Sequence, residues 1–270
     1  MRTNEINPRD FARHIRAHAL RMVFKARSSH IGSCLSMADI LAVLYTRVMR
    51  IDPAQPQLVE RDRLIVSKGH AAAIIYAALA ERGYFPVAEL YTFCADGSAL
   101  TGHVSHAVPG VEVSTGSLGH GLPIAVGMAL AAKAAGRTSR IYCLLSDGEC
   151  DEGSNWEAIL FSPHHKLDNL IVIVDFNKVQ SFGRVSEVLN LEPFADKWRA
   201  FGWDTLEVDG HDPAALENGF SAPVVCGKPR VLIAHTVKGR GVSFMEDKLE
   251  WHYKSPSDEQ LNAALAEIGA

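Results

Sequence analysis

Short, continuous apolar runs that alternate with helix-forming stretches dominate the second half of this chain. The strand-sized runs span residues 141–146, 170–176, 203–209 and 229–236. The helical stretches between them span residues 155–165, 194–201 and 213–220. Strands that are buried on both faces have this composition, because helices cover both sides of a parallel sheet. The pattern therefore predicts an α/β fold, a parallel sheet with helices on both faces.

The first half of the chain is mostly helical by the spacing of its apolar side chains. Three helices are expected there: one entered through Pro8 and reaching Phe24, one N-capped by Ser36, and one from His70 to Arg82. Residues 62–67 read as a short buried strand, and residues 122–135 as an alanine-rich helix. Without repeats or linkers, we expect a single domain over residues 1–270, with an irregular C-terminal segment from about residue 239.

Composition bears on the partners and the compartment. The net charge of −4 gives no reason to expect nucleic acid or an anionic membrane surface as a partner. Five scattered cysteines without a C-x-x-C pair are typical of reduced thiols in a cytoplasmic protein. The N-terminus lacks the apolar region of a signal peptide, and no apolar run reaches the ~20 residues of a membrane span. We expect a soluble, cytoplasmic chain with no nucleic-acid and no membrane partner.

Two oxygen-bearing side chains follow neighbouring apolar runs, where ligands bind at a parallel sheet. Asp147 follows the run at 141–146, and Asn177 follows the run at 170–176. Mg²⁺ prefers oxygen ligands and keeps phosphate oxygens and water among them, and the Val179 carbonyl is a candidate third ligand. Gly148 lets the main chain approach a diphosphate and donate its N–H. Either side chain alone is more often a turn former, but their spacing favours a metal–diphosphate site.

The stretch from Ser146 to Asn177 resembles the thiamine-diphosphate motif, which begins Gly-Asp-Gly and closes on Asn about thirty residues later. Ser146 stands where many relatives carry glycine. Over nearly its whole length, the chain resembles the diphosphate-binding half of transketolase. The resemblance implies the thiamine-diphosphate-binding fold (diphosphate domain), thiamine diphosphate as cofactor, and Mg²⁺, or Ca²⁺ or Mn²⁺ in its place, held by Asp147, Asn177 and Val179.

Three histidines lie in contexts similar to transketolase motifs. They are His30 in SSHIGSCLS, His70 in SKGHAAAIIY and His103 in LTGHVSH. A lone histidine is more often a surface or capping residue, but three in family-like order favour a site. By resemblance His70 contacts the diphosphate, while His30 and His103 bind substrate hydroxyls and move protons. The histidines that match no motif are expected at the surface: His106, His164, His165 and His211.

The remaining cofactor contacts are also implied by resemblance. The loop GVEVSTGSLGHG is similar to the family's cofactor loop, so Gly116 and Leu118 are expected to touch the cofactor. Gly148 and Glu149 in the metal motif are grouped with them. In the closing segment, Lys238 is expected over the diphosphate and His252 beside the reacting carbonyl. The alternative is that Trp251-His252-Tyr253 only packs a C-terminal arm.

The same resemblance implies that this chain supplies only one half of a transketolase active site. The glutamate that protonates the aminopyrimidine and the pyrimidine pocket come from a second domain in relatives. We expect a separate C-terminal subunit with the pyrimidine-binding and C-terminal domains, an α2β2 assembly, and packing against the helix at 122–135. Glu152 resembles a glutamate that pairs with the partner's catalytic glutamate across the interface, where two carboxyls can share a proton.

The leading hypothesis is the N-terminal subunit of a split transketolase, which transfers a two-carbon ketol unit between a ketose (phosphate) and an aldose (phosphate). A second reading is the α-type subunit of a 2-oxo-acid dehydrogenase, or a deoxyxylulose-phosphate synthase-like enzyme, because these share the metal motif. His30, His70 and His103 favour sugar substrates over that reading. A third is a non-catalytic cofactor-binding subunit. A nucleotide-binding module lacks support, since no G-x-x-x-x-G-K-[ST] run occurs.

Overall fold

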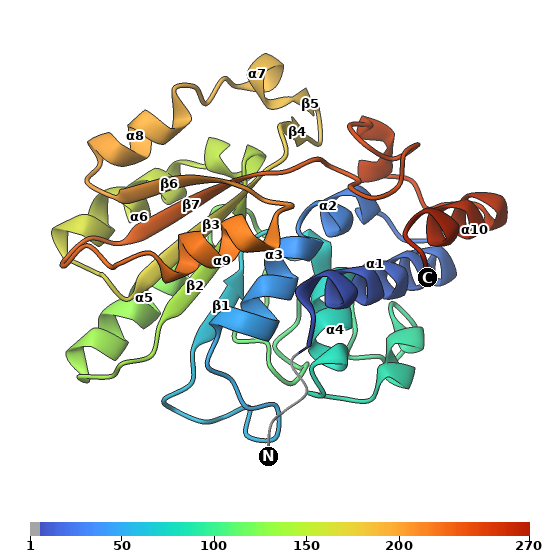
Figure 1. Ribbon diagram of the computed structural model, residues 1–270, viewed down its shortest axis with the longest axis horizontal. Coiled ribbons are helices and arrows are strands. Elements are labelled where there is room, and N and C mark those ends of the chain that lie inside the picture. The colour runs from blue at the N-terminus through green and yellow to red at the C-terminus, as the bar shows by residue number, and fades with distance from the viewer. Residues whose placement is uncertain (1–5) are drawn as a thin grey trace.

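Five parallel strands form the central sheet of the computed structural model, which describes residues 6–270 (Figure 1). The strands are β1 (Arg63–Val66), β2 (Ile141–Ser146), β3 (Leu170–Phe176), β6 (Asp204–Asp209) and β7 (Arg230–His235). They lie in the order β1-β2-β3-β7-β6, and every neighbouring pair runs parallel. The strand expectations from the apolar runs are therefore confirmed.

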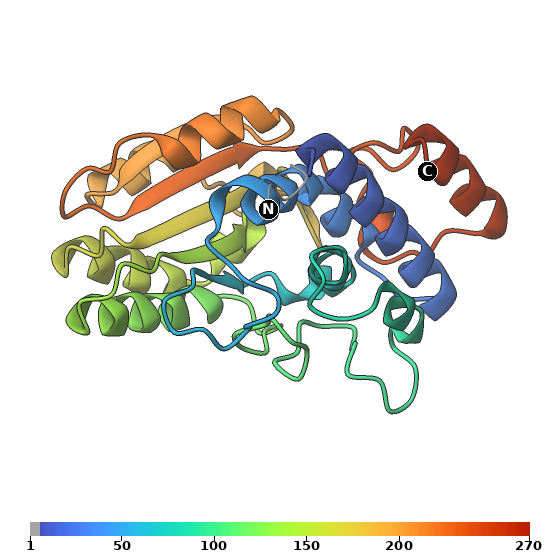
Figure 2. The ribbon, with the colours of Figure 1, turned by 60° about the horizontal axis from the view of Figure 1, so that its bottom comes forward.

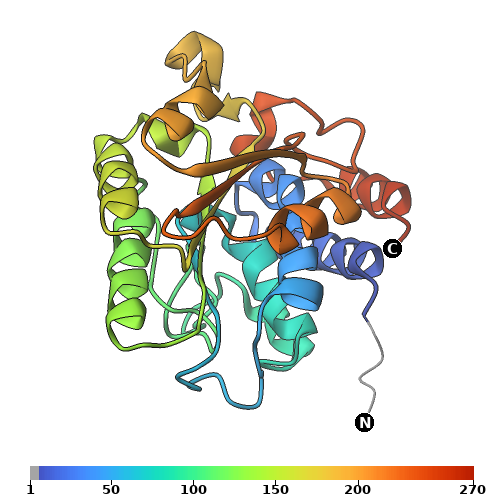
Figure 3. The same ribbon diagram turned by 60° about the vertical axis from the view of Figure 1, so that its left-hand side comes forward.

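Helices cover both faces of this sheet (Figure 3). On one face lie α1 (Pro8–Ala26), α2 (Ile31–Ser36), α3 (Ala38–Val43), α4 (Ala72–Glu81) and α9 (Pro213–Ser221). On the other lie α5 (Gly121–Ala134), α6 (Gly153–His164) and α8 (Phe194–Ala200). Along β2, Tyr142 and Leu144 belong to the first core, whereas Cys143 and Leu145 belong to the second. This alternation is the period of a strand buried on both faces, so the α/β prediction is confirmed.

The register of the sheet brings three strand ends together. Ser146 at the end of β2 is the partner of Asp175 in β3, and Phe176 at the end of β3 is the partner of His235 in β7. The residues that follow β2, β3 and β7 therefore emerge side by side at the carboxyl edge of the sheet. Ligands of parallel α/β sheets bind at this edge.

The helix expected after Ser36 is α3, which begins at Ala38 with Met37 as its N-cap residue, and a separate short helix, α2, precedes it. The chain turns helical at Ile31, and Ser36 is the last residue of α2 rather than an N-cap. Its hydroxyl donates to the Asp175 carboxylate at 2.6 Å. The capping pattern misled because this serine binds a buried carboxylate far along the chain, not the backbone of a helix. A π-helical turn, η1 (Leu44–Val48), follows α3.

The C-terminal segment is less irregular than predicted. After turns and a 3-10 helix, η5 (Leu249–His252), it forms α10 (Asp258–Glu267), which packs on α1 (Figure 2). Ser257 and Gln260 form a capping box at its start, a pattern visible in the sequence as Ser-x-x-Gln. The smaller elements are η2 (Gly69–Ala71), η3 (Val87–Thr92), η4 (Gly148–Asp151), β4 (Val179–Gln180), β5 (Gly183–Arg184) and α7 (Val185–Val188). None of the helices within residues 6–270 has the length and apolarity needed to cross a bilayer.

Candidate active site

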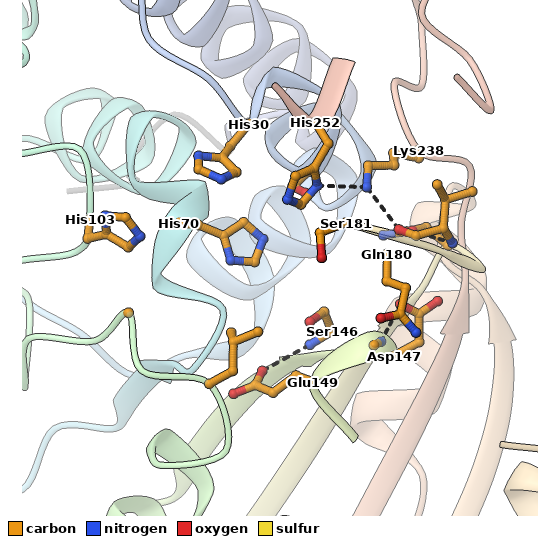
Figure 4. A pocket seen from close by; sticks show the side chains of 16 residues that line it. His30, His70, His103, Ser146, Asp147, Glu149, Gln180, Ser181, Lys238 and His252 are labelled. Carbon is orange, nitrogen blue, oxygen red and sulfur yellow. Dashed lines mark hydrogen bonds between the residues drawn. The ribbon is translucent and has the colours of Figure 1, made fainter. Parts of the chain in front are cut away.

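A cavity of about 220 Å³ opens at the carboxyl edge of the sheet (Figure 4). It is lined by His30, Ser33, His70, His103, Gly116, Leu118, Ser146, Asp147, Gly148, Glu149, Asn177, Val179, Gln180, Ser181, Lys238 and His252. Every residue predicted for the site lines this cavity except Glu152. Residues from widely separated parts of the sequence therefore meet in one place.

Four histidines gather on one wall of the cavity. The His30 ring centroid lies 5.1 Å from that of His70, 6.0 Å from that of His103 and 4.9 Å from that of His252. His30 has φ 72°, a left-handed conformation that a non-glycine residue adopts at a cost. Its backbone N–H donates to the His252 carbonyl at 3.0 Å. The strained backbone and this bond hold the His30 ring toward the other three.

The rings of His30, His70 and His252 are neutral at pH 7. Burial, the nearby His103 and the charge of Lys238 lower the pKa of His30 to about 4. Burial and Lys238 lower the pKa of His252 to about 3, and burial and Lys68 lower the pKa of His70 well below its ordinary value. A neutral imidazole donates from one nitrogen and accepts at the other, as a sugar hydroxyl requires.

The lowered pKa of His30 predicts how stability depends on pH. As the pH falls below the ordinary value of 6.5, the unfolded chain takes up a proton at this position before the folded chain does. The stabilising contribution of neutral His30 is thus complete above about pH 6.5 and is lost as the pH falls toward about 4. In urea unfolding, we expect the free energy of unfolding of the wild type to fall relative to that of His30→Gln over this window. His106→Gln, on an exposed loop, is the control; an equal pH dependence of wild type and His30→Gln would contradict the assignment.

Asp147 and Asn177 lie beside each other behind the strand ends. The Asp147 carboxylate is buried and accepts from the Lys178 N–H and, at 2.7 Å, from the Gly148 N–H. The Gly148 N–H, expected to face a diphosphate, thus donates to its neighbour here. Asn177 Oδ1 accepts from the Val179 N–H at 3.2 Å. Burial and the charge of Asp175 raise the pKa of Asp147 to about 6, so a cation beside this carboxylate would favour its charged form.

The donor set fits a metal that shares its shell with a ligand. Among the lining residues, Asp147, Asn177 and Val179 offer a carboxylate, an amide oxygen and a main-chain carbonyl. Within residues 6–270, no three His, Cys, Asp or Glu side chains are grouped to hold a metal ion by themselves. Oxygen-only ligands that leave half a shell open suit Mg²⁺ completed by phosphate oxygens and water.

A buried ion pair lies beneath these oxygens. Lys68 and Asp175 have side chains that are 0% exposed, and Lys68 Nζ donates to Asp175 Oδ2. The Asp175 carboxylate also accepts from the hydroxyls of Ser36 and Thr236 and, at 3.2 Å, from Asn177 Nδ2. Burial alone would raise the pKa of Asp175, but the Lys68 charge and these donors lower it. The pair orients the Asn177 amide because its nitrogen is held by the carboxylate.

Glu149 joins the loop that carries Gly116 and Leu118 to the sheet. Its Oε1 accepts from the Ser67 hydroxyl and, at 2.9 Å, from the Gly119 N–H, and its Oε2 accepts from the Ser146 N–H at 3.3 Å. Burial raises its pKa. The family resemblance predicts Glu149 as a cofactor contact, and the structure shows that its carboxylate binds this same loop.

Glycine is required where two segments approach closely. A Cβ on Gly148 would lie 2.6 Å from Cβ of Gln180, and a Cβ on Gly116 would lie 2.9 Å from Cδ2 of His103. Real Cβ atoms do not come so near to a neighbouring side chain, so the metal motif and the loop need these glycines.

Lys238 closes one side of the cavity. Its Nζ donates to the Val179 carbonyl at 2.8 Å and lies 3.0 Å from Nδ1 of His252 (Figure 4). Burial, with the charge of Lys68 next in importance, lowers the pKa of Lys238 to about 8, so the amine is mainly charged at pH 7. His252 lines the cavity, whereas Trp251 is buried in the core.

Glu152 does not line the cavity, and one of the four histidines expected at the surface is not exposed. Glu152 is exposed and is the N-cap residue of α6. His106, His164 and His165 are exposed as expected, but the prediction for His211 was wrong. Its Nδ1 lies 2.8 Å from Asp39 Oδ2, and its Nε2 accepts from the Val237 N–H at 2.8 Å. His211 thus joins α3 to the segment before Lys238.

Sequence reasoning missed several residues around the cavity. They are Ser33, Gln180 and Ser181 in the lining, and Lys68 and Asp175 beneath it. Gln180 belongs to a two-residue strand, too short to give an apolar pattern. Asp175 did carry a signal, since it is the charged residue in the run LIVIVDF and a buried carboxylate requires a partner.

Comparison with known proteins agrees with this geometry. The family described as "Transketolase, thiamine diphosphate binding domain" matches residues 8–269. An apulose-4-phosphate transketolase subunit from Actinobacillus succinogenes is 47% identical over 240 residues, covering 88% of this chain and 87% of that protein. The 6-deoxy-6-sulfo-D-fructose transketolase subunit SqwG of a Clostridium species is 42% identical over 270 residues, covering 99% and 98% respectively.

Solved structures of transketolases share this fold. The structure of transketolase from Leishmania mexicana superimposes with a TM-score of 0.92 at 32% identity. The match covers 98% of this chain but 42% of that one, so the chain spans about two-fifths of the solved enzyme's length. With the family matched over nearly all its residues, the chain belongs to the transketolase family and represents its thiamine diphosphate binding domain.

Proposed function

We propose that this chain is the N-terminal, diphosphate-binding subunit of a two-subunit transketolase. The holoenzyme would transfer a two-carbon ketol unit from a ketose (phosphate) to an aldose (phosphate). The observation that carries this proposal is a single cavity that combines the oxygens of Asp147, Asn177 and Val179 with the rings of His30, His103 and His252. Relatives that match this chain along most of their own length are named as subunits of transketolases.

The residues divide by the part of the ligand they would hold. Asp147, Asn177 and the Val179 carbonyl would bind Mg²⁺, and His70 and Lys238 would donate to the diphosphate. Thiamine diphosphate, when bound, supplies a carbanion at its thiazolium ring that accepts the two-carbon unit.

The histidines would act on the sugar. His30, His103 and His252 lie on one wall, where their ring nitrogens can form hydrogen bonds with sugar hydroxyls. Proton transfer by such positioned groups contributes about 10²- to 10⁴-fold to rates. Four imidazole rings beside one another favour a polyhydroxylated substrate over a 2-oxo acid, which has few hydroxyls to bind.

A comparison of two reactions tests this assignment. The chain, mixed with a separate C-terminal transketolase subunit, thiamine diphosphate and Mg²⁺, should transfer ketol units between sugar phosphates and should not decarboxylate pyruvate. Decarboxylation in its place would favour the 2-oxo-acid reading, and no turnover with any sugar phosphate would favour a non-catalytic subunit.

The partner would complete the site. We propose one domain in this chain, and a separate C-terminal subunit that supplies the pyrimidine pocket and the catalytic glutamate in a cytoplasmic α2β2 assembly. Exposed Glu152 at the start of α6 is available to face that glutamate. Apolar side chains on the outer faces of the neighbouring helices α5 and α6 support packing there: Ile124, Leu130, Leu160 and Phe161 are exposed. All five cysteines are free, as a reducing compartment favours.

The exposed face of α6 predicts an assembly defect. Leu160 is 62% exposed, so Leu160→Asp should leave the fold intact but place an unpaired charge in the interface. Loss of an interface anchor costs more than about 1.4 kcal/mol, so the Kd for the partner should rise at least tenfold. Sedimentation of mixed subunits measures this change. Val225→Asp, in an exposed loop before β7, is the control; equal affinities of both variants would place the partner elsewhere.

A further inference from the structure

Lys238 connects two groups of the cavity that have different tasks. Its Nζ contacts the Val179 carbonyl at 2.8 Å and His252 Nδ1 at 3.0 Å. The lysine is 1% exposed, so bulk water does not compete for either contact. The His252 main chain is fixed as well, because its carbonyl accepts from the His30 N–H at 3.0 Å. The ring therefore has little freedom to turn away from the ammonium.

The chemistry of these two groups determines where the imidazole hydrogen lies. An ammonium has three N–H donors and no lone pair, so it can only donate to His252 Nδ1. A nitrogen that accepts a hydrogen bond in the ring plane carries no hydrogen. A neutral imidazole has one N–H, which must then be on Nε2.

We propose that Lys238 is a positioning residue that fixes the neutral tautomer of His252, so that His252 meets the substrate as a hydrogen-bond donor through Nε2. The inference rests on the proposed function for the identity of the substrate, but not for the tautomer. The lowered pKa of His252 agrees with it, since a neutral ring is the form in which the tautomer matters.

Within residues 6–270, His30 has no lysine partner for its ring, and its hydrogen bond does not fix its tautomer. His30 Nδ1 lies 2.9 Å from the Ser29 hydroxyl, and a hydroxyl can either donate or accept. Both neutral tautomers of His30 keep this bond, so its other nitrogen can give or take a proton. The two histidines thus divide the work: His252 holds a substrate oxygen by donation, and His30 is free to exchange a proton.

This role does not compete with a diphosphate contact. Two of the three N–H groups of Lys238 are directed to Val179 and His252, and the third remains for an anion in the cavity. One lysine can therefore join the metal ligand, the diphosphate and the substrate-binding ring.

Nitrogen NMR of the isolated subunit tests the tautomer directly. In chain labelled with ¹⁵N-histidine, without cofactor, long-range ¹H–¹⁵N correlations should show His252 protonated at Nε2 alone, with the signal assigned by its loss in His252→Gln. In Lys238→Met the Nδ1–H tautomer should become populated, while the His30 signal keeps its wild-type pattern. A hydrogen on Nδ1 in the wild type would overturn the inference even if the variant failed to fold. An unchanged His252 pattern in folded Lys238→Met would also overturn it.

Kinetics of the complete enzyme test the donor role separately. A glutamine side chain places an amide N–H near the position of imidazole Nε2. The kcat/KM of His252→Gln should therefore be roughly tenfold or more higher than that of His252→Ala, which is the effect of one hydrogen bond. Equal kcat/KM for the two variants would contradict a donor role. A complex that shows no ketol transfer at all would refute the proposed function, and the NMR result would still decide the tautomer.

Discussion

Asp147→Ala is expected to weaken the binding of thiamine diphosphate in the presence of Mg²⁺ by more than about 100-fold, and to remove activity with it. Losing even an indirect contact to a metal costs about 10- to 100-fold in affinity, and Asp147 offers the site its one carboxylate among the three proposed ligands. The variant should remain folded, because burial already raises the pKa of this carboxyl to about 6 and removing it relieves that cost. Calorimetric titration of the two-subunit complex with the cofactor measures the loss.

Two comparisons make this result interpretable. Asp147→Asn keeps an oxygen at the same place but removes the charge, so its affinity should fall between those of the wild type and Asp147→Ala. Asp196→Ala removes a carboxylate that is 69% exposed and lies outside the cavity lining, and should leave the affinity unchanged. An Asp147→Ala complex that binds the cofactor as tightly as wild type would remove Asp147 from the metal site.

Lys68→Met is expected to lower the free energy of unfolding by about 3–5 kcal/mol, since it leaves the Asp175 carboxylate buried without its cation. Hydrogen bonds from Ser36 and Thr236 remain, but they do not neutralise the charge. Urea unfolding of the purified subunit measures the change.

The double variant Lys68→Met/Asp175→Asn separates charge from packing. It has no unpaired charge, so it should recover most of the stability lost in Lys68→Met. The amide introduced in place of the Asp175 carboxylate can present either its oxygen or its nitrogen to Asn177, so metal affinity should remain reduced although the fold recovers. If Lys68→Met unfolds at the same urea concentration as wild type, the pair does not carry the stability assigned to it.

The sequence predicted the elements whose side chains repeat and missed those that depend on distant partners. The runs that became β2 and β3 match at every residue, because all positions of both strands are buried. Ser36 was misread as a helix cap, since nothing local shows that its hydroxyl donates to a residue in β3. His211 was placed at the surface for the same reason, because Asp39 lies far from it in the chain.

The residues of the site were more predictable from the sequence than the contacts that hold them in place. Asp147, Asn177 and the pocket histidines stand at strand ends or in recognisable motifs, so their meeting follows from parallel topology. The ammonium of Lys238 lies between Val179 and His252 only because the C-terminal segment folds back over the sheet edge. No periodicity or spacing in the sequence encodes that return.

Crystals of the two-subunit complex grown with thiamine diphosphate and Mn²⁺ would show where the metal binds, because Mn²⁺ accepts the oxygen ligands of Mg²⁺ and scatters anomalously. We expect one anomalous peak per copy of this chain, within about 2.0–2.4 Å of Asp147, Asn177 and the Val179 carbonyl, and bridged to the diphosphate. A cofactor bound with its metal away from these three oxygens, or a cavity that stays empty at saturating cofactor, would contradict the proposed metal site.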